Sequence, residues 1–212
     1  MTQPDILAKA IEFHGHMCPG LALGIRAAEA GVAQVGIHAA DNEIVAIVET
    51  DMCAVDAIQF LTGCTLGKGN LVHRDHGKNA CTFVRRSDGR AVRVSMRAGG
   101  PGVSDTGWMG LFIKVRSGMA SEEERARFVA AQQERSERIL SAAIDDLYDV
   151  REVHIQPPPA AQIFESVECA SCGEPTMETR LRRLDGRELC LVCFDEALGG
   201  TIPVASPTPG RR

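Results

Sequence analysis

The sequence has few aromatic side chains, no long apolar run and little net charge. Aromatic residues make up 4% of the 212 residues, so a core must be built from aliphatic side chains. No run of about 18 or more apolar residues occurs, which excludes a membrane-spanning helix. Residues 1–12 also lack the apolar stretch of a signal peptide. We therefore expect a cytoplasmic protein with no membrane partner.

The net charge of −5 and the sequence pI of about 5.7 argue against a nucleic-acid-binding surface over the whole molecule. A local basic patch remains compatible with that balance. Hydrophobic residues make up 44% of the chain, which is enough for a sizeable core. The length suits one domain with a small added module.

Cysteine, by contrast, is abundant, with eight residues in the chain. In a reducing compartment these residues indicate metal ligands or reactive groups rather than disulfides. Four of them form the pattern Cys169-x-x-Cys172, seventeen residues, Cys190-x-x-Cys193. Two such pairs supply a tetrahedral shell of four sulfurs for zinc, with no position left open for catalysis. The pattern therefore predicts a structural zinc site and zinc as a cofactor.

The segment around these cysteines is too small to fold on its own apolar core. We expect metal binding to stabilise it, by about 10–16 kcal/mol for structural sites of this kind. Residues 181–184 and 187–189 predict a hairpin between the two cysteine pairs. Arg180, Arg182, Arg183 and Arg187 give it local positive charge. That charge fits a protein or nucleic-acid partner, or simply a solvated hairpin face.

A second group of candidate ligands lies near the N-terminus, where His14, His16 and Cys18 fall within five residues. Pro19 suits the first turn of a helix, which places Cys18 at a helix N-terminus. Cys53 has the same position in the helix that follows residues 43–49. A helix N-terminus favours thiolate. We interpret these four residues as a core metal site.

The same group also allows a thiol enzyme, with Cys18 or Cys53 as nucleophile and His14 or His16 as base. The alternative for each cysteine is a buried apolar residue. Four further residues give weaker signals, because each also fits a core or surface position: Cys64, His73, His76 and Cys81. Residues 63–69 are similar to a phosphate loop but lack its Ser or Thr and follow a helix, so we reject nucleotide binding there.

Hydrophobic patterns and turn residues predict helices and strands in alternation. Helices are expected at residues 4–12, 19–29, 52–61 and 122–147, and strands at 43–49, 80–86, 91–97, 111–115 and 150–155. The strands 80–86 and 91–97 form a predicted hairpin. Gly20, Gly24 and Ala28 share one helix face and allow close packing. Ser121 and Glu124 form a capping box before the helix at 122–147, which is long enough to reach a partner subunit.

Composition divides the chain into four parts. Residues 1–156 form a predicted core domain, and residues 157–164 a Pro-rich linker. Residues 165–198 form the zinc-finger domain. Residues 199–212 are rich in Gly and Pro and are expected to be a flexible tail.

Three sequence blocks resemble the FmdE family, which takes its name from a component of formylmethanofuran dehydrogenase. The first is Phe13-His-Gly-His-x-Cys-Pro-Gly-Leu-Ala-Leu-Gly24; the others are residues 49–70 and 75–80. The cysteine pairs resemble TraR/DksA-type zinc fingers. The resemblance implies an α+β fold, with a mixed or antiparallel sheet core, packed helices and a small C-terminal zinc-finger domain. It also implies an intertwined homodimer. His14, His16, Cys18, Cys53 and Cys64 fall in its motif blocks, and the motif does not say which of them bind metal.

Three functions are compatible with these observations. The first is a metal-binding FmdE-like protein, accessory to a molybdenum or tungsten formylmethanofuran dehydrogenase-type oxidoreductase or to its metal handling. The second is a regulatory or adaptor protein, with a metal-sensing core and a zinc finger that contacts protein or nucleic acid. The third is the Cys-dependent enzyme. The sequence gives neither a reaction and substrate nor the identity of a core metal.

Overall fold

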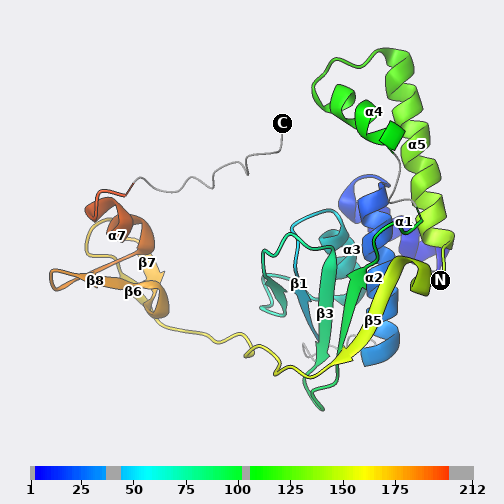
Figure 1. Cartoon of the computed structure of the whole chain (residues 1–212). Coiled ribbons are helices and arrows are strands. Elements are labelled where there is room, and N and C mark those ends of the chain that lie inside the picture. The colour runs from blue at the N-terminus through cyan, green and yellow to red at the C-terminus, as the bar shows by residue number, and fades with distance from the viewer. Residues whose placement is uncertain (1–2, 37–43, 102–105, 201–212) are drawn as a thin grey trace. The chain divides into compact units, whose positions relative to one another are not determined.

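A mixed five-stranded sheet is the centre of the first of two units in this chain (Figure 1). The computed structural model describes residues 3–36, 44–101 and 106–200. The chain divides into Met1–Ala161 and Gln162–Arg212, which we call the core unit and the finger unit. The sequence predictions for Glu43 and for residues 201–212 lie outside the described residues. Within the described ranges, no helix has both the length and the apolar character needed to cross a membrane.

The strands lie in the order β2–β1–β3–β4–β5 across the sheet. β1 and β2 are parallel, and the other neighbours are antiparallel. The pairing of β3 with β4 confirms the predicted hairpin, and a mixed sheet with packed helices confirms the α+β class. The strands are β1 Ile44–Val48, β2 Leu71–His73, β3 Ala80–Arg85, β4 Ala91–Met96 and β5 Tyr148–Val153.

Strand β1 is buried along its whole length. Successive side chains of a strand point to opposite faces of the sheet. Ala46 and Val48 therefore pack into the main hydrophobic cluster, which also contains Phe83. Val45 and Ile47 pack into a smaller cluster on the other face. The loop after β1 is thus held by an element that is buried on both faces.

Helix α2 is the main helical partner of the sheet. It packs against β3, β4 and α3. The prediction that it stops near Gly31 is wrong, because Gly31 lies inside the helix. A side chain there would come within 2.1 Å of the Phe83 ring, so this glycine serves packing rather than helix termination. The three N-terminal helices are α1 Pro4–His14, α2 Pro19–Val35 and α3 Ala54–Thr62.

The contact between α2 and α3 has no side chain at its centre. A Cβ atom on Gly24 would lie 2.2 Å from the carbonyl oxygen of Ala54. The backbones therefore approach more closely than any other residue would allow. This agrees with the predicted packing face of Gly20, Gly24 and Ala28.

Residues 106–131, which we call the arm, extend beyond the sheet (Figure 1). They comprise α4 (Thr106–Arg116) and the first half of α5 (Glu122–Ser141). The predicted strand at 111–115 is wrong, because these residues lie in α4. Trp108 and Phe112 are four residues apart, a helical spacing. Both stack on Phe128 of α5, with ring centroids 5.8 and 6.2 Å from it.

The predicted helix at residues 122–147 is interrupted. Ser121 and Glu124 form the predicted capping box. However, α5 ends at Ser141, and Ala142 and Ala143 are extended before the short helix α6 (Ile144–Leu147). The Arg26 guanidinium donates a hydrogen bond of 2.8 Å to the Ala142 carbonyl oxygen. A contact from α2 thus holds the break.

An ion pair crosses the sheet directly after β1. The carboxylate of Glu49 accepts hydrogen bonds from the guanidinium of Arg93 on β4. His76 Nδ1 lies 3.3 Å from the same carboxylate. Burial alone would raise the pKa of Glu49, but the hydrogen bonds from Arg93 and His76 lower it below its ordinary value. The charged carboxylate is therefore the form that the fold stabilises.

The proline-rich segment contacts the core unit. Arg86 donates hydrogen bonds to the carbonyl oxygens of Pro158 and Pro159, at 2.5 and 3.4 Å. A Cβ atom on Gly69 would lie 2.9 Å from the side chain of Ala161. Residues 157–161 accordingly belong to the core unit, and the division between the units follows Ala161.

The finger unit consists of two short hairpins and one helix. The hairpin of β8 and β9 turns at Asp185 and Gly186, as predicted. Helix α7 begins directly after Cys190. Its elements are β6 Ser166–Glu168, β7 Pro175–Met177, the 3-10 turn Glu178–Arg180, β8 Arg182–Leu184, β9 Arg187–Leu189 and α7 Leu191–Ala197.

The substitution Gly24→Ala is expected to destabilise the chain by about 3 kcal/mol, because the new methyl group meets the backbone of α3. The matched control is Gly110→Ala in α4, where nothing lies within 4 Å of the new atom. That change should stabilise by about 0.5–1 kcal/mol. Urea unfolding measures both values. Equal stabilities for the two variants would contradict the close α2–α3 contact.

The Glu49 ion pair predicts a pH dependence of stability. Because the fold lowers the pKa of Glu49, its contribution is present above the unfolded-state value, about 4.5, and is lost as pH falls through the lower folded value. Glu49→Gln should cost about 1–2 kcal/mol at neutral pH. The difference from wild type should shrink below about pH 4.5. Urea unfolding across this pH range checks the expectation, with the exposed Glu152→Gln as a control. A pH-independent difference would contradict it.

Candidate metal centres

The first candidate centre lies where α1 ends and α2 begins. α1 ends at His14, and Gly15 takes a left-handed conformation (φ 93°) that turns the chain sharply. Cys18 then caps the N-terminus of α2. The ligand atoms of His14, His16 and Cys18 all lie within 4.8 Å of one another. Three of the predicted core ligands are thus brought together by one turn.

Asp56 on α3 fixes the orientation of the His14 ring. Its carboxylate lies 2.7 Å from His14 Nδ1, and the His14 side chain is only 8% exposed. The other ring nitrogen, Nε2, lies 3.7 Å from Cys18 Sγ. A carboxylate on one nitrogen of a histidine leaves the other free to act as a ligand or a base. Asp56 was not predicted as a site residue, although it lies three residues after Cys53.

Cys53 approaches Cys18 from the neighbouring helix. It precedes the start of α3, as Cys18 precedes that of α2. The position of a Cβ on Gly20 would be 3.7 Å from the Cys53 sulfur and 3.8 Å from the Cys18 sulfur. The missing side chain at Gly20 therefore leaves room for both sulfurs. All four predicted core ligands lie in this region, although Cys53 is outside the tightest group of three.

The two thiols share a proton unequally. A hydrogen bond from the Cys18 thiol lowers the pKa of Cys53 to about 5, and the nearby His14 acts in the same direction. Donating that hydrogen bond, together with burial, raises the pKa of Cys18 above its ordinary value. The backbone N–H of Leu21 also donates to the Cys18 sulfur, at 3.3 Å. The pair is thus one coupled acid with a single readily lost proton.

The other predicted candidates lie elsewhere. Cys64 is buried and donates a hydrogen bond of 3.3 Å to the Ile44 carbonyl oxygen. Burial raises the pKa of Cys64, and it raises the pKa of Cys81 in β3 to about 12. His73, at the end of β2, and His76, in the loop that follows, are exposed. Cys64 and Cys81 therefore have the surroundings of core residues.

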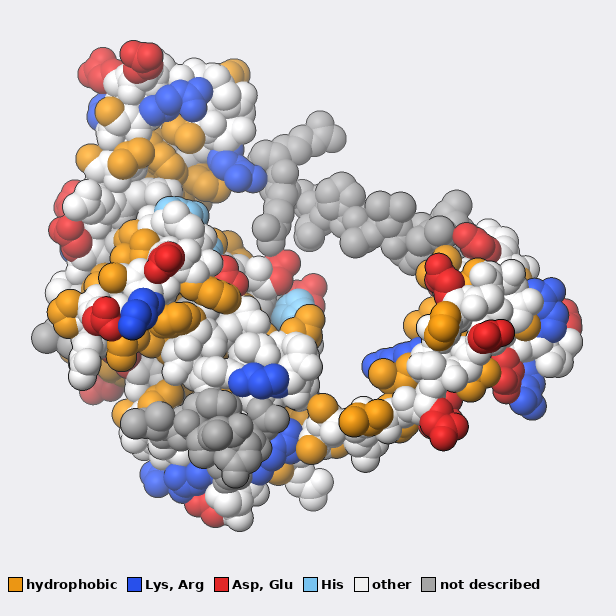
Figure 2. Space-filling view, turned by 180° about the vertical axis from the view of Figure 1, so that it is seen from behind, with side chains coloured by type: hydrophobic (Ala, Val, Ile, Leu, Met, Phe, Trp, Pro, Cys, Tyr) orange, Lys and Arg blue, Asp and Glu red, His pale blue; other side chains and the backbone are white. Residues whose placement is uncertain are grey.

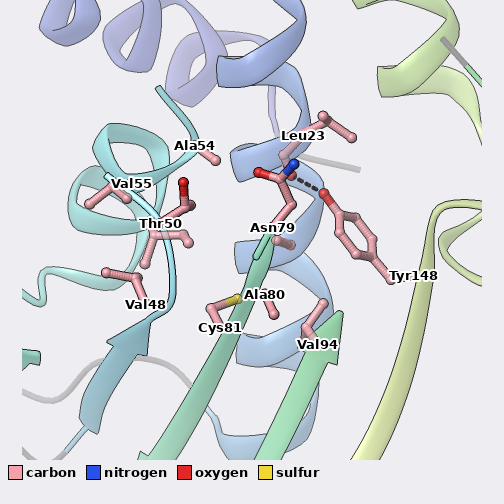
Figure 3. Close-up of a pocket in the computed structure, with 12 residues that line it drawn as sticks. Leu23, Val48, Thr50, Ala54, Val55, Asn79, Ala80, Cys81, Val94 and Tyr148 are labelled. Atoms are coloured by element: carbon pink, nitrogen blue, oxygen red, sulfur yellow. Dashed lines mark hydrogen bonds between the residues drawn. The ribbon is translucent and has the colours of Figure 1, made fainter. Parts of the chain in front are cut away.

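A small apolar cavity lies between α2, α3 and the sheet (Figure 3). It holds about 20 Å³, which is close to the space for one water molecule. Tyr148 lines it and donates a hydrogen bond of 2.7 Å to the carbonyl oxygen of Leu23. The cavity is too small for a substrate of any size beyond a few atoms.

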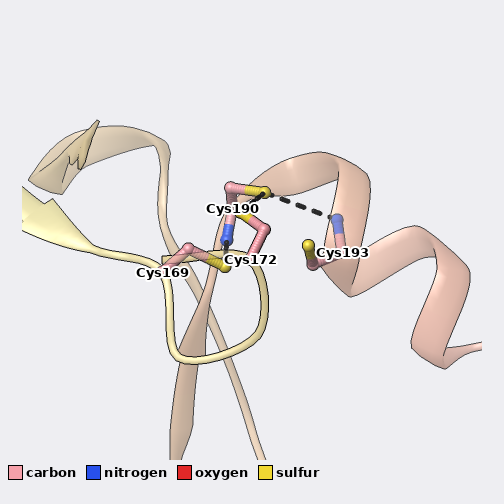
Figure 4. Close-up of side chains that lie close together, drawn as sticks. All are labelled: Cys169, Cys172, Cys190 and Cys193. Carbon is pink, nitrogen blue, oxygen red and sulfur yellow. Dashed lines mark hydrogen bonds between the residues drawn. The ribbon is translucent and has the colours of Figure 1, made fainter. Parts of the chain in front are cut away.

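The second candidate centre is the four-cysteine cluster of the finger unit (Figure 4). The sulfurs of Cys169, Cys172, Cys190 and Cys193 all lie within 4.8 Å of one another. Backbone N–H groups donate to two of them: Cys190 to the Cys169 sulfur at 3.2 Å and Cys193 to the Cys190 sulfur at 3.5 Å. Hydrogen bonds from backbone N–H groups lower the pKa of Cys169 to about 6. Four thiols with this spacing and support suit zinc.

The arginines of the finger unit do not make it basic. Arg183 pairs with Glu188 across the β8–β9 hairpin at 2.8 Å. Residues 165–196 contain four arginines and eight acidic residues, so the unit carries net negative charge even before the cysteines ionise. This distribution does not favour a polyanionic partner.

Two family models match the chain. The model described as "FmdE, Molybdenum formylmethanofuran dehydrogenase operon" matches residues 13–149. The model described as "Prokaryotic dksA/traR C4-type zinc finger" matches residues 162–197. The first covers the sheet and all four core candidates, and the second covers the four-cysteine cluster.

Individual proteins also resemble this chain. A curated protein of Archaeoglobus fulgidus, called a probable S-adenosyl-L-methionine-binding protein, is 39% identical over 197 residues. The match covers 89% of this chain but 52% of the relative, so the chain spans about half the length of that relative. A crystal structure of an FmdE-like protein of tungsten formylmethanofuran dehydrogenase, from Syntrophus aciditrophicus, superposes with a TM-score of 0.60. It is 26% identical, and the match covers 91% of this chain and 92% of that one.

Proposed function

The chain belongs to the FmdE family and carries a dksA/traR-type zinc finger, and we propose that its core unit binds a second metal ion. The ligands would be His14, His16, Cys18 and Cys53. Two imidazoles with two thiolates suit zinc, and also suit iron, nickel or copper. When bound, such an ion would supply a positive charge that stabilises both thiolates. The finger ion is structural, because four cysteines complete its shell.

The observation that supports the core site best is the hydrogen bond between Asp56 and His14. Metal-binding histidines commonly use their second nitrogen to contact a carboxylate, which fixes the ring and strengthens the ligand. Here Asp56 holds Nδ1 at 2.7 Å while Nε2 lies beside the Cys18 sulfur. A histidine with an incidental role on the surface would not need this arrangement, and His14 is nearly buried.

A role beside a molybdenum or tungsten oxidoreductase is the finer part of the proposal. It follows from the family description and from the name of the related protein of Syntrophus aciditrophicus. The core unit would deliver or hold a metal ion for such an enzyme, in the cytoplasm, where eight free cysteines remain reduced. Co-purification with the oxidoreductase would support this role, and co-purification with transcription machinery would favour a regulatory one.

The S-adenosylmethionine in the name of the Archaeoglobus relative is not transferred to this chain. Nearly half of that relative has no counterpart here, and that half can carry the binding site. The cavity of Figure 3, at about 20 Å³, cannot hold a nucleoside. We instead propose a protein partner for the finger unit, because its acidic residues outnumber its arginines.

The arm is proposed to form a homodimer contact. Met109, Ile113, Met119 and Val129 are each more than half exposed, and Figure 2 shows apolar side chains gathered on the arm. Exposed apolar groups of this number on one projecting element favour a protein contact. An exchange of arms between two copies would make the dimer intertwined.

Metal content tests the core site in the full chain. Wild type is expected to hold two metal ions per chain, because the two clusters bind separately. Cys18→Ser should lose the core ion and Cys172→Ser the finger ion, leaving one in each case. Cys64→Ser, with a buried thiol outside both clusters, should keep both. Elemental analysis measures the ratio. A Cys18→Ser variant with undiminished metal would contradict the core site.

Sedimentation velocity tests the arm contact. Wild type is expected to sediment as a dimer, and Ile113→Glu should shift it to monomer, because a charge replaces an exposed apolar side chain on α4. Arg116→Glu, also exposed on α4, is the control and should leave the dimer intact. A wild-type monomer, or an Ile113→Glu dimer of unchanged stability, would exclude the arm as the interface.

A further inference from the structure

Cys18 and Cys53 bring two thiols of the core unit together from different helices. Each immediately precedes a helix, α2 and α3 respectively. Their thiols are joined by a hydrogen bond. The space left by the absent side chain of Gly20 is bounded by both sulfurs, at 3.7 and 3.8 Å from the position of its Cβ. Two sulfurs this close can be joined by a small side-chain movement.

We propose that Cys18 and Cys53 are a redox-active dithiol, oxidised to an internal disulfide by small disulfides such as oxidised glutathione. This goes beyond metal binding, because it gives the site a second chemical state and a class of reactant. It requires no other cysteine of the core. Cys64 is held by the Ile44 carbonyl group, and Cys81 is buried within β3.

The exposure of the two residues sets the order of the steps. Cys53 is partly exposed, whereas Cys18 is 6% exposed. Cys53 therefore attacks one sulfur of the small disulfide, forming a mixed disulfide and releasing one thiolate. Cys18 then attacks the Cys53 sulfur, forming the internal disulfide and releasing the second thiolate. The two protons of the protein thiols end on the two released thiolates. Two electrons pass from the protein to the small disulfide.

The geometry also predicts that oxidation and metal binding exclude each other. This part rests on the proposed core metal site, because a disulfide removes two of its four ligands. The dithiol itself does not depend on that site. A metal ion held by both sulfurs would block the attack of Cys53, and a disulfide would leave only His14 and His16.

Peptide mapping of the full chain tests the dithiol. Trypsin leaves Cys53 and Cys64 together in residues 27–68, while Cys18 lies in residues 10–26. The measurement is therefore made on Cys64→Ser, so that each peptide holds one cysteine. The reduced, metal-free protein is treated with excess oxidised glutathione, alkylated, digested and analysed by mass spectrometry. The expected product is residues 10–26 linked to residues 27–68, with no glutathione attached.

Two variants separate the steps. Adding Cys18→Ser should trap glutathione on Cys53, because no second thiol can release it. Adding Cys53→Ser should leave Cys18 largely unmodified, because it is buried. Alkylation of both cysteines after the oxidant, or glutathione on Cys53 without the internal link, would overturn the proposal.

A third arm adds zinc before the oxidant and separates this proposal from the core metal site. Protection of both cysteines by zinc would support both. An internal disulfide that forms equally with and without zinc would support the dithiol and contradict the metal site. No internal disulfide in metal-free protein would contradict the dithiol alone.

Discussion

The contact between α2 and α3 is the constraint on which the candidate core site depends. Helices with ordinary side chains at their contact pack with axes about 8–10 Å apart. Here Gly24 faces the backbone of Ala54, and a Cβ atom at position 24 would overlap it. One turn earlier on α2, Gly20 leaves the equivalent space to Cys53. The two glycines thus convert a packing contact into a meeting of two helix N-termini, each preceded by a cysteine.

Charge explains why this meeting favours a cation. Two thiols at helix N-termini and the Asp56 carboxylate bring acidic groups into a small, partly buried region. Without a positive charge, both thiols cannot ionise together at low cost, because like charges at short distance repel strongly. In the structure they share one proton, which lowers the pKa of Cys53 and raises that of Cys18. A metal ion or a covalent bond between the sulfurs would each resolve the same repulsion.

The sequence could reveal those features that depend on local spacing. The zinc cysteines, the β3–β4 hairpin and the capping box at Ser121 each follow from residues close in the chain, and each was predicted. What was missed depends on distant contacts. α5 ends because Arg26, 116 residues away, binds the Ala142 carbonyl group. α2 continues past Gly31 because Phe83 fills the space beside it. The role of Asp56 appears only when α3 packs against α1 and brings it to His14. Strand β2 has three residues, too few for a periodic pattern.

The two units use metal-ligand chemistry in physically different ways. The finger unit has a small buried cluster around Cys169, Leu189 and Cys193, so its ion must supply much of the stability. The core unit contains a large aliphatic cluster, centred on Phe83 and the buried strand β1, that does not involve the candidate ligands His14 and His16. The core fold therefore does not require its ion. An ion that is not needed for folding can leave and return while its ligands keep their places. That property suits metal transfer or sensing, and it leaves the dithiol free to react between occupied states.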